Sequence, residues 1–336
     1  MRSEPADMTP LTVYLNSAGA TNAANIMMAL RRGGLKVRII AGDMDRLAAG
    51  LFLADKGYVV PPVASDEFLP ALLDICRTEK VDVALPVYSA DFPVFARHRQ
   101  RLESEGIRTY APSPESLAVC DDKVRVIEAM SGLGVSCPRT WSYEQALERR
   151  ADLPYPLMMK RRSGSGSRGI QKLEGPADLD VHLAPEYIVQ EYLDGEEYTV
   201  DAVSDLSGRM LAASPRLRAK IYGGLSVRGV TVADDRIVAA TRTIVEGLGL
   251  VGPSNVQCKR TTGGELKFFE VNPRFASGGL PLAVAAGLNG PEILLRLIMG
   301  WEVPPIRVEP GVVMIRYWES LFVRKTGDGD AYALCD

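Results

Sequence analysis

The chain has 336 residues, 46% of them hydrophobic and 24% charged, which is enough for two or three subdomains with sizeable cores. Its formal net charge of −3 implies no surface built for polyanions, so we expect no nucleic-acid partner, although local basic clusters could still serve a small phosphate ligand. No apolar run approaches the ~20 residues of a membrane helix, and the polar N-terminus lacks the apolar core of a signal peptide, so we expect a cytoplasmic protein without membrane contact.

Strand-like and helix-like patterns alternate through the first third of the chain. Thr21 and Ser65 are the predicted N-caps of the first two helices. The first strand–helix turn, NSAGATNAA, lacks the GxGxxG pattern, so a dinucleotide fingerprint is absent. The alternation predicts a parallel, doubly wound sheet. Strands are predicted at residues 11–16, 35–42, 81–87 and 107–112, and helices at 21–34, 65–80 and 90–106.

Beyond residue 112 the pattern changes. Two short helices are predicted within residues 113–141, and from residue 154 short strands dominate, which indicates an α+β region with antiparallel sheet. A long helix capped by Asp234 or Asp235 then precedes the segment SNVQCKRTTGGELKFFEVNPR. Two further helices and a late strand, GVVMIRYW, follow this segment.

Cysteine and histidine are sparse. The five cysteines have no CxxC spacing and indicate reduced thiols. The two histidines, His98 and His182, lie in charged, helix-like surroundings and are expected at the surface. This pattern argues against a histidine-rich zinc site or a histidine-dependent hydrolase. A metal would then have oxygen ligands, which favours Mg²⁺ or Mn²⁺.

The segment 254–274 predicts a β-hairpin with two strands on either side of a Gly-Gly pair. Gly-Gly at 263–264 tolerates positive φ at both central positions, so it suits a two-residue type I′ turn. That turn places Gln257 opposite Glu270 and Asn255 opposite Asn272. Directly opposed side chains have Cβ atoms only ~5 Å apart, so these four side chains are expected to converge.

Alternation along the hairpin separates a polar face from an apolar one. Glu270, Asn272 and Arg274 are spaced two residues apart and share one face, whereas Val256 and Cys258 take the core-facing side. A row of oxygen-bearing side chains predicts a metal site. The alternative is an ordinary solvated sheet face, and a β-bulge would break the register without necessarily breaking the site.

A glycine- and serine-rich loop follows the apolar strand pattern PLMMK. Its basic neighbours and exposed backbone N–H groups suit a polyphosphate, although it lacks the P-loop pattern GxxxxGK[ST]. A strand pattern on each side predicts a flap that closes over phosphates, and the alternative is a basic linker. Lys160 ends the strand and is the better candidate for a fixed phosphate contact. The loop candidates are Ser163, Gly164, Ser165, Gly166, Ser167 and Gly169.

These motifs, in this order, resemble the ATP-grasp superfamily over nearly the whole chain. The segment SNVQ…FFEVNPR most resembles the large subunit of carbamoyl phosphate synthase, while the general layout resembles single-unit carboxylate–amine ligases. The resemblance implies an α/β and α+β ATP-grasp fold. Its expected parts are an N-terminal parallel-sheet, Rossmann-like pre-ATP-grasp domain at 1–115, a central lid subdomain at 116–189, and a C-terminal antiparallel-sheet domain with the metal site at 190–336.

The same resemblance implies an ATP site. Lys123, in DDK, and Lys160 would contact the phosphates, and the loop 163–169 would fold over them. Glu197, in GEEYTVDA, would lie near the ribose or the metal cluster. A hinge strand that hydrogen-bonds adenine would be formed by Gln190, Glu191, Tyr192 and Leu193.

The resemblance also implies the reacting groups. Arg274 would stabilise the anionic acyl phosphate or tetrahedral intermediate. Lys220 and Arg228 are further cation candidates, with a charged edge strand as the alternative. Many ATP-grasp ligases carry Asp or Glu at the first ligand position, where this chain has a neutral Gln, although the synthase pattern tolerates it. The implied ligands of two Mg²⁺ (or Mn²⁺) ions are Gln257, Glu270 and Asn272.

The implied activity is that of an ADP-forming, carbon–nitrogen bond-forming ligase that joins a small-molecule carboxylate and an amine through an acyl phosphate. The family resemblance implies amino acids or short peptides as the substrate class. The fold implies a homodimer. One alternative is a carbamoyl phosphate synthase-like enzyme with a carbamoyl or phosphorylated product. A complete carbamoyl phosphate synthesis is not expected, because the chain has one synthetase unit where the full large subunit has two. The other alternative is a non-catalytic ATP-binding module.

Overall fold

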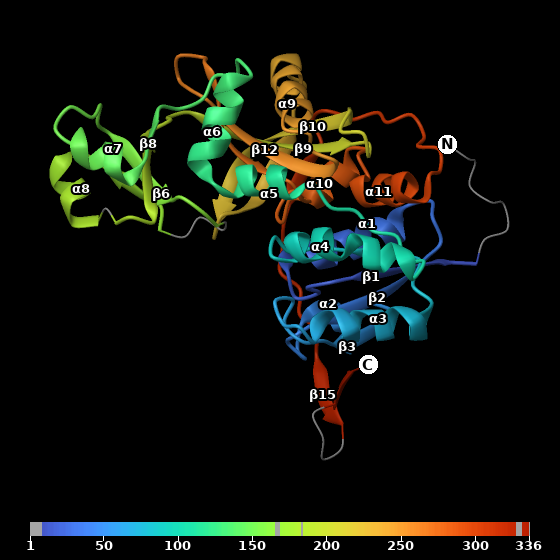
Figure 1. The fold of residues 1–336 in the computed structure, drawn as a ribbon. Helices are drawn as coiled ribbons and strands as arrows, with labels where there is room; N and C mark the ends of the chain where they lie inside the picture. The colour runs from blue at the N-terminus through green and yellow to red at the C-terminus, as the bar shows by residue number, and fades with distance from the viewer. Residues whose placement is uncertain (1–8, 165–168, 183, 327–330, 336) are drawn as a thin grey trace. The chain divides into compact units, whose positions relative to one another are not determined.

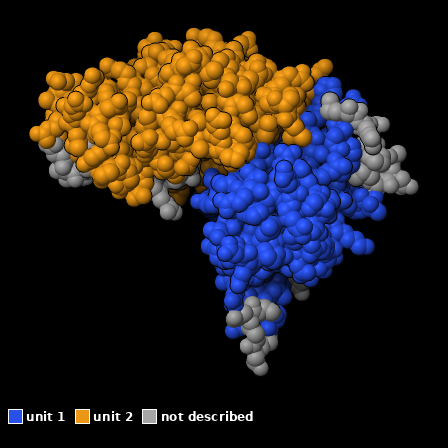
Figure 2. Space-filling model, in the orientation of Figure 1, with its two compact units in different colours: residues 1–111, 289–305, 315–336 blue, residues 112–288, 306–314 orange. Residues whose placement is uncertain are grey.

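A computed structural model describes residues 9–164, 169–182, 184–326 and 331–335. The chain forms two compact units, shown in different colours in Figure 2. Within the described residues, no helix combines the length and apolarity needed to cross a bilayer. The first unit contains Met1–Ala111, Asn289–Pro305 and Ile315–Asp336, and the second contains Pro112–Leu288 and Ile306–Met314.

The first unit is built on the predicted parallel sheet, whose strand order is β3-β2-β1-β4 (Figure 1). Its central strand β1 is fully buried and pairs in parallel with both β2 and β4. Helices α3 and α4 share one apolar core with Tyr14 and Ile40. The elements are β1 Leu11–Leu15, α1 Thr21–Arg32, β2 Val37–Asp43, α2 Ala49–Leu53, β3 Lys56–Val59, α3 Phe68–Glu79, β4 Val83–Leu85 and α4 Asp91–Ser104.

Three local predictions in this unit are wrong. Residues 107–112 form no strand, because Arg108 makes only an isolated bridge to Val83. The fourth strand is instead β3, which is short and half-exposed and therefore carries no apolar pattern. The predicted N-caps also shift: α1 is capped by Ala20 and α3 by Glu67, both without a side-chain hydrogen bond.

The second unit contains a six-stranded sheet with the order β13-β12-β9-β10-β11-β14. One face of this sheet packs against α5, α6 and α9 in a single apolar core. Asp234 caps α9, which confirms one of the two predicted caps. The elements are α5 Pro114–Asp121, α6 Lys123–Gly132, β9 Glu196–Ser204, β10 Met210–Tyr222, β11 Leu225–Thr231, α9 Asp235–Gly247, β12 Gly252–Arg260, β13 Leu266–Asn272 and β14 Val313–Ile315.

A smaller antiparallel sheet in the same unit, with the order β5-β8-β6-β7, has its own apolar core. No pattern in the sequence predicted α7, whereas α8 covers the helix-like surroundings predicted for His182. The remaining helices α10 and α11 match the two predicted after the hairpin. The elements of this part of the second unit are β5 Thr140–Trp141, α7 Tyr143–Glu148, β6 Leu157–Arg161, β7 Gln171–Leu173, α8 Pro176–His182, β8 Tyr187–Glu191 and α10 Leu280–Ala285. The first unit also contains α11 Gly290–Met299, β15 Val323–Thr326 and β16 Ala331–Leu334.

The β12–β13 hairpin has the predicted pairing but a different turn. Thr261 accepts from the Gly264 N–H and donates its own N–H to Glu265, and only Gly264 has a positive φ, of 84°. The predicted two-residue type I′ turn is therefore wrong. A β-bulge between the turn and the site, with Phe269 as the extra residue, restores Gln257 opposite Glu270.

The turn generates a stability prediction. Gly264→Ala should lower the free energy of unfolding by about 1 kcal/mol, because a Cβ is disfavoured in the left-handed region. Gly263→Ala is the matched control, since its φ is not positive and its added Cβ would make only ordinary contact with Thr261. Urea midpoints of the two variants measure the difference, and equal losses would contradict the assigned turn.

Candidate active site

A row of polar side chains crosses three strands of the large sheet. The pairing sets Asn255 opposite Asn272, and Gln257 opposite Glu270, as predicted from the sequence. On the other side of β12, Asn255 and Gln257 face Asp201 and Thr199 of β9. The reverse face of the same strands is apolar and belongs to the core. We call this polar side the site face.

Glu270 is the hub of the site face. Its Oε1 accepts hydrogen bonds from Asn272 Nδ2 at 2.8 Å and from Gln257 Nε2 at 3.3 Å. Arg274 Nη2 donates to Asn272 Oδ1 at 3.4 Å, and Asn255 Nδ2 donates to the Arg274 carbonyl at 3.0 Å. The predicted convergence of these side chains is therefore present.

The donor set of the hub fits a hard cation. Rotation of the Gln257 and Asn272 amides would present two carbonyl oxygens beside the Glu270 carboxylate, and such oxygens are the ligands of Mg²⁺. Zn²⁺ prefers Cys and His ligands, whereas the donors here are carboxylate and amide oxygens, so the set suits Mg²⁺ better than Zn²⁺. Among the described residues, no group of three His, Cys, Asp or Glu side chains could hold a metal ion.

Two buried lysines accompany Glu270. Lys160, on β6, is 6% exposed, and its Nζ lies 5.4 Å from the centroid of the Phe269 ring. Lys123, the first residue of α6, is 9% exposed, and its Nζ donates to the Gly164 carbonyl at 2.7 Å. Lys123 thus contacts the start of the glycine-rich loop directly.

The same junction is fixed by an ion pair beside Lys123. Asp122 caps α6 and accepts a two-pronged contact from Arg162, with Nη2 to Oδ2 at 2.8 Å. The Lys123 N–H donates to the Arg162 carbonyl at 3.0 Å. The helix that carries one lysine is therefore tied to the strand end that carries the other.

Burial sets the charge balance of the lysines. Desolvation lowers the pKa of Lys160 to about 8, although the nearby Glu270 carboxylate opposes this shift. Burial also lowers the pKa of Lys123, and Glu270 again acts in the opposite direction. At pH 7 Lys160 remains mostly protonated. Both ammonium groups are largely buried, which favours an anionic binding partner.

The described part of the glycine-rich loop is exposed. Ser163, Gly164 and Gly169 are solvent-accessible, and both glycines have positive φ, at 92° and 69°. The predicted loop residues Ser165, Gly166 and Ser167 lie outside the described residues. The loop connects β6 to β7 of the small sheet.

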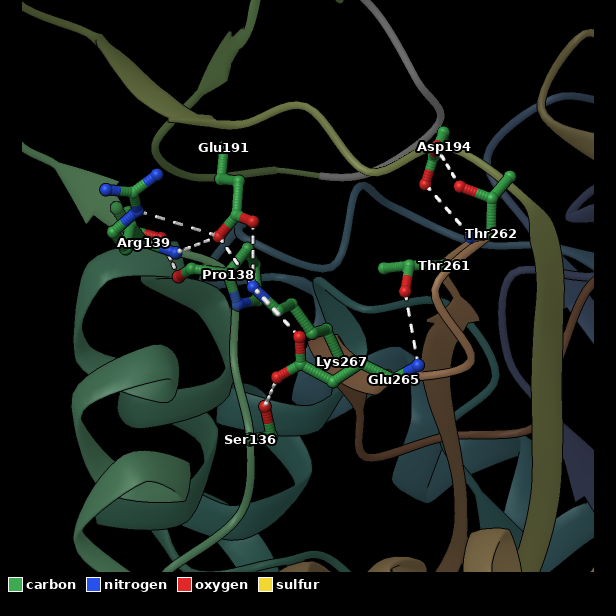
Figure 3. A network of polar contacts seen from close by, with 10 residues as sticks. Ser136, Pro138, Arg139, Glu191, Asp194, Thr261, Thr262, Glu265 and Lys267 are labelled. Atoms are coloured by element: carbon green, nitrogen blue, oxygen red, sulfur yellow. Dashed lines mark hydrogen bonds and ion pairs between the residues drawn. The ribbon is translucent and has the colours of Figure 1, made fainter. Parts of the chain in front are cut away.

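The predicted hinge is tied to the same hairpin that carries the hub, and Figure 3 shows part of this network. Lys267 Nζ contacts both Glu191 carboxylate oxygens, at 2.7 and 2.9 Å. Lys259 Nζ donates to the Leu193 carbonyl at 3.0 Å, and Thr262 Oγ1 donates to Asp194 at 2.6 Å. The hinge and the polar row are thus held to one hairpin.

The hinge side chains are themselves engaged. Burial would raise the pKa of Glu191, but its hydrogen bonds with Lys267 and the Arg139 N–H outweigh this and lower the pKa. The buried Gln190 donates from Nε2 to Thr140 at 2.8 Å, and the Tyr192 ring lies 4.6 Å from the Nζ of a lysine on β7. These contacts fix the strand whose predicted role is adenine binding.

Two comparisons with protein families match separate parts of the chain. Residues 14–110 match the family described as "PylC-like, N-terminal domain". Residues 184–319 match "ATP-grasp in the biosynthetic pathway with Ter operon". Residues 184–319, which contain the hinge and the hub, are therefore an ATP-grasp segment. The observed parallel sheet, small antiparallel sheet and six-stranded antiparallel sheet are the expected ATP-grasp fold.

Distant relatives extend this family match along the chain. The carbamoyl phosphate synthase large chain of Clostridium perfringens is 22% identical over 310 residues, which are 86% of this chain and only 28% of that protein's length. A Campylobacter jejuni biotin carboxylase, solved as its β-γ-ATP complex, has a TM-score of 0.70 at 16% identity and covers 89% of this chain and 74% of its own. The L-amino acid ligase of Bacillus licheniformis has a TM-score of 0.65 at 14% identity, with 87% and 75% covered.

Glu197, on β9, lies two residues from Thr199 on the site face, and its carboxylate also acts on the charge of Lys160. It pairs with Arg218 and lies 4.0 Å from Lys259 Nζ. Lys220, on β10, and Arg228, on β11, are exposed cross-strand partners. Lys220 lies four residues after Arg216 on the same strand. Their roles as substrate contacts remain predictions.

Sequence reasoning missed Asp201 and Arg216, which extend the site face. Arg216 Nε donates to Asp201 Oδ2 at 2.7 Å, and both residues are buried. The signal was available, because Glu197, Thr199 and Asp201 alternate along one apolar strand.

The low pKa of Lys160 predicts a pH effect on stability. Between pH 8 and 10.5 the unfolded chain keeps this proton while the folded chain releases it, so stability should rise with pH across that window. Lys160→Met should remove this rise and stabilise the protein at pH 7 by up to roughly 3 kcal/mol. Urea midpoints of wild type and variant from pH 7 to 10 measure the difference, and parallel curves would contradict the shifted pKa.

Proposed function

We propose that the chain is an ADP-forming ligase that activates a carboxylate with ATP and joins the acyl group to an amine. The observation that carries this proposal is the meeting of two desolvated lysines, Lys123 and Lys160, with the Glu270 hub. Cations with no bulk water around them favour a polyanion, and an oxygen hub beside them suits the Mg²⁺ that accompanies nucleotide phosphates.

The nucleotide position follows from the elements around this cluster. The β- and γ-phosphates would lie between the two lysines, under the loop 163–169, and the adenine would lie against the hinge 190–193. Gln257, Glu270 and Asn272 would hold Mg²⁺. When bound, Mg²⁺ would neutralise phosphate charge and orient the terminal phosphate. The contacts of Lys259 and Lys267 with the hinge would keep adenine and phosphate positions in a fixed relation.

The proposed reaction has two steps. A carboxylate oxygen attacks the γ-phosphorus, the bond to the β-phosphate oxygen breaks, and ADP and an acyl phosphate form. An amine nitrogen then attacks the acyl carbon, the carbon–oxygen bond to phosphate breaks, and the amine loses a proton to solvent. Lys160 and Lys123 would stabilise charge on the phosphates, and Arg274 would stabilise the oxyanion. Catalysis would rest on positioning and charge neutralisation.

The substrate classes follow from chemistry and fold. Amino acids are the first carboxylates and amines to test, because the L-amino acid ligase shares the fold over 87% of this chain. A second candidate is favoured by the neutral Gln257 and the similarity to carbamoyl phosphate synthase. In that case the carboxylate would be bicarbonate and the product a carbamoyl or phosphorylated compound.

A substrate screen separates these candidates. We expect ADP release only when ATP, Mg²⁺ and a suitable carboxylate are present, and hydroxylamine should trap the acyl phosphate as a hydroxamate. ADP release with bicarbonate and no hydroxamate would favour the second candidate. ATP binding without ADP release from any pair would contradict a ligase and indicate a non-catalytic module.

Two substitutions test the roles at the hub. Glu270→Gln should lower kcat about 10²–10³-fold, because it removes the carboxylate of the metal site, and Arg274→Lys should lower kcat by a similar factor through loss of the fork-shaped donor. Steady-state ADP release measures both. Glu302→Gln and Arg236→Lys, at exposed positions that form no part of the row, are the matched controls. Turnover at the wild-type rate in Glu270→Gln would remove the hub from the mechanism.

A further inference from the structure

A buried ion pair lies on the site face behind the hub. Asp201, on β9, is the cross-strand neighbour of Asn255 on one side and of Ser214 on the other. Arg216 Nε donates to Asp201 Oδ2 at 2.7 Å, and the two residues are 3% and 7% exposed. Within the described residues, Arg216 Nη1 and Ser214 Oγ have no hydrogen-bond partner.

A buried ion pair of this kind contributes little net free energy to folding. Removing two charges from water costs several kcal/mol per ion, and the mutual attraction repays this only with excellent geometry and further hydrogen bonds. Here one guanidinium nitrogen is left without a partner among the described residues. The contacts of the Arg216 guanidinium therefore indicate a role other than stability.

The Arg216 guanidinium packs directly against the backbone of Gly279. A Cβ built on Gly279 would overlap the Cζ, Nε and Nη2 atoms of Arg216. The φ of Gly279 is −107°, which any residue can adopt, so space and not backbone conformation requires glycine here. Gly279 is the N-cap of α10 and ends the segment 275–279, which begins directly after Arg274.

The other end of the segment 275–279, next to Arg274, is held by Asn255 of the site face. Asn255 Nδ2 donates to the Arg274 carbonyl at 3.0 Å, and Asn255 neighbours Asp201 across the strands. The backbone around Arg274 is thus fixed at its carbonyl by Asn255 and, five residues later, by the guanidinium of Arg216. The Arg274 guanidinium itself reaches Asn272 Oδ1 at 3.4 Å.

We propose that Arg216 and Asp201 are positioning residues that fix the segment 275–279 and, through it, place the Arg274 guanidinium beside Asn272 and Glu270. This rests on the proposed function, because the role of Arg274 is part of it. A displacement of about 1 Å in such a group can cost about a hundredfold in rate. The pair therefore acts on the reaction through Arg274 without touching the reactants.

Two single variants disturb the contact from opposite sides. Arg216→Lys keeps the charge but loses the planar fork, and Gly279→Ala pushes a methyl group into the guanidinium. Both should lower kcat about tenfold to a hundredfold with KM for ATP nearly unchanged. Gly132→Ala is the matched control, since nothing lies within 4 Å of its added Cβ. Wild-type kcat in both variants would overturn the proposal.

The decisive measurement is a double variant. If Arg216 acts through Arg274, then Arg216→Lys combined with Arg274→Ala should be no slower than Arg274→Ala alone. Two independent effects would multiply, so that the double variant would be slower than Arg274→Ala by the factor measured for Arg216→Lys alone. That multiplied loss of kcat would overturn the proposal even if each single variant is slow.

If a single variant fails to fold, both members of the ion pair are replaced together. Asp201→Leu with Arg216→Met substitutes apolar groups, a change that often preserves stability. A folded double variant with reduced kcat supports the positioning role, and a folded one with wild-type kcat overturns it.

A second readout does not need turnover. Amide hydrogen exchange of residues 275–279 should be faster in Arg216→Lys and Gly279→Ala than in wild type and Gly132→Ala. If wild type releases no ADP with any substrate, the proposed function fails while this measurement still decides whether the pair fixes the segment. Unchanged exchange in both variants would overturn the inference by itself.

Discussion

The antiparallel pairing of β12 with β13 is the constraint on which the site depends. Side chains alternate between the two faces of a strand, so a slip of one residue would turn Glu270 and Asn272 toward the core and Val271 toward the polar side. The pairing is held by buried Val256, Cys258 and the rest of the apolar face. The energy that fixes the polar row is therefore supplied by the opposite face of the same strands.

The pairing of Gln257 with Glu270 and of Asn255 with Asn272 was predicted correctly from the sequence, although the turn used for that prediction is wrong. The turn at Thr261–Gly264 differs by one residue from a two-residue loop, and the bulge at Phe269 shifts the register by one residue in the compensating direction. Two consecutive apolar residues, Phe268 and Phe269, were the visible sign of an interrupted alternation. Local turn chemistry cannot reveal such a bulge, because the extra residue is set by packing against β6 and the core.

Other parts of the site were beyond a single sequence for a different reason. The contact of Lys267 with Glu191 joins residues 76 positions apart, and that of Lys123 with Gly164 joins residues 41 apart. Periodicity places a side chain on a face of its own element, but it does not say which distant element covers that face. Asp201 was within reach of the same alternation that found Glu270, whereas the partner Arg216 required the strand order.

The charges of the site argue that metal and nucleotide bind together. The hub offers one carboxylate, Glu270, because Gln257 and Asn272 are neutral, while Lys123 and Lys160 place two cations beside it. A divalent cation alone would meet weak attraction there. Mg²⁺ is commonly bound through one or two carboxylates together with substrate phosphates. The phosphates would satisfy both lysines and supply the missing negative charge, so the affinity for Mg²⁺ would belong to the complex with nucleotide and not to the empty protein.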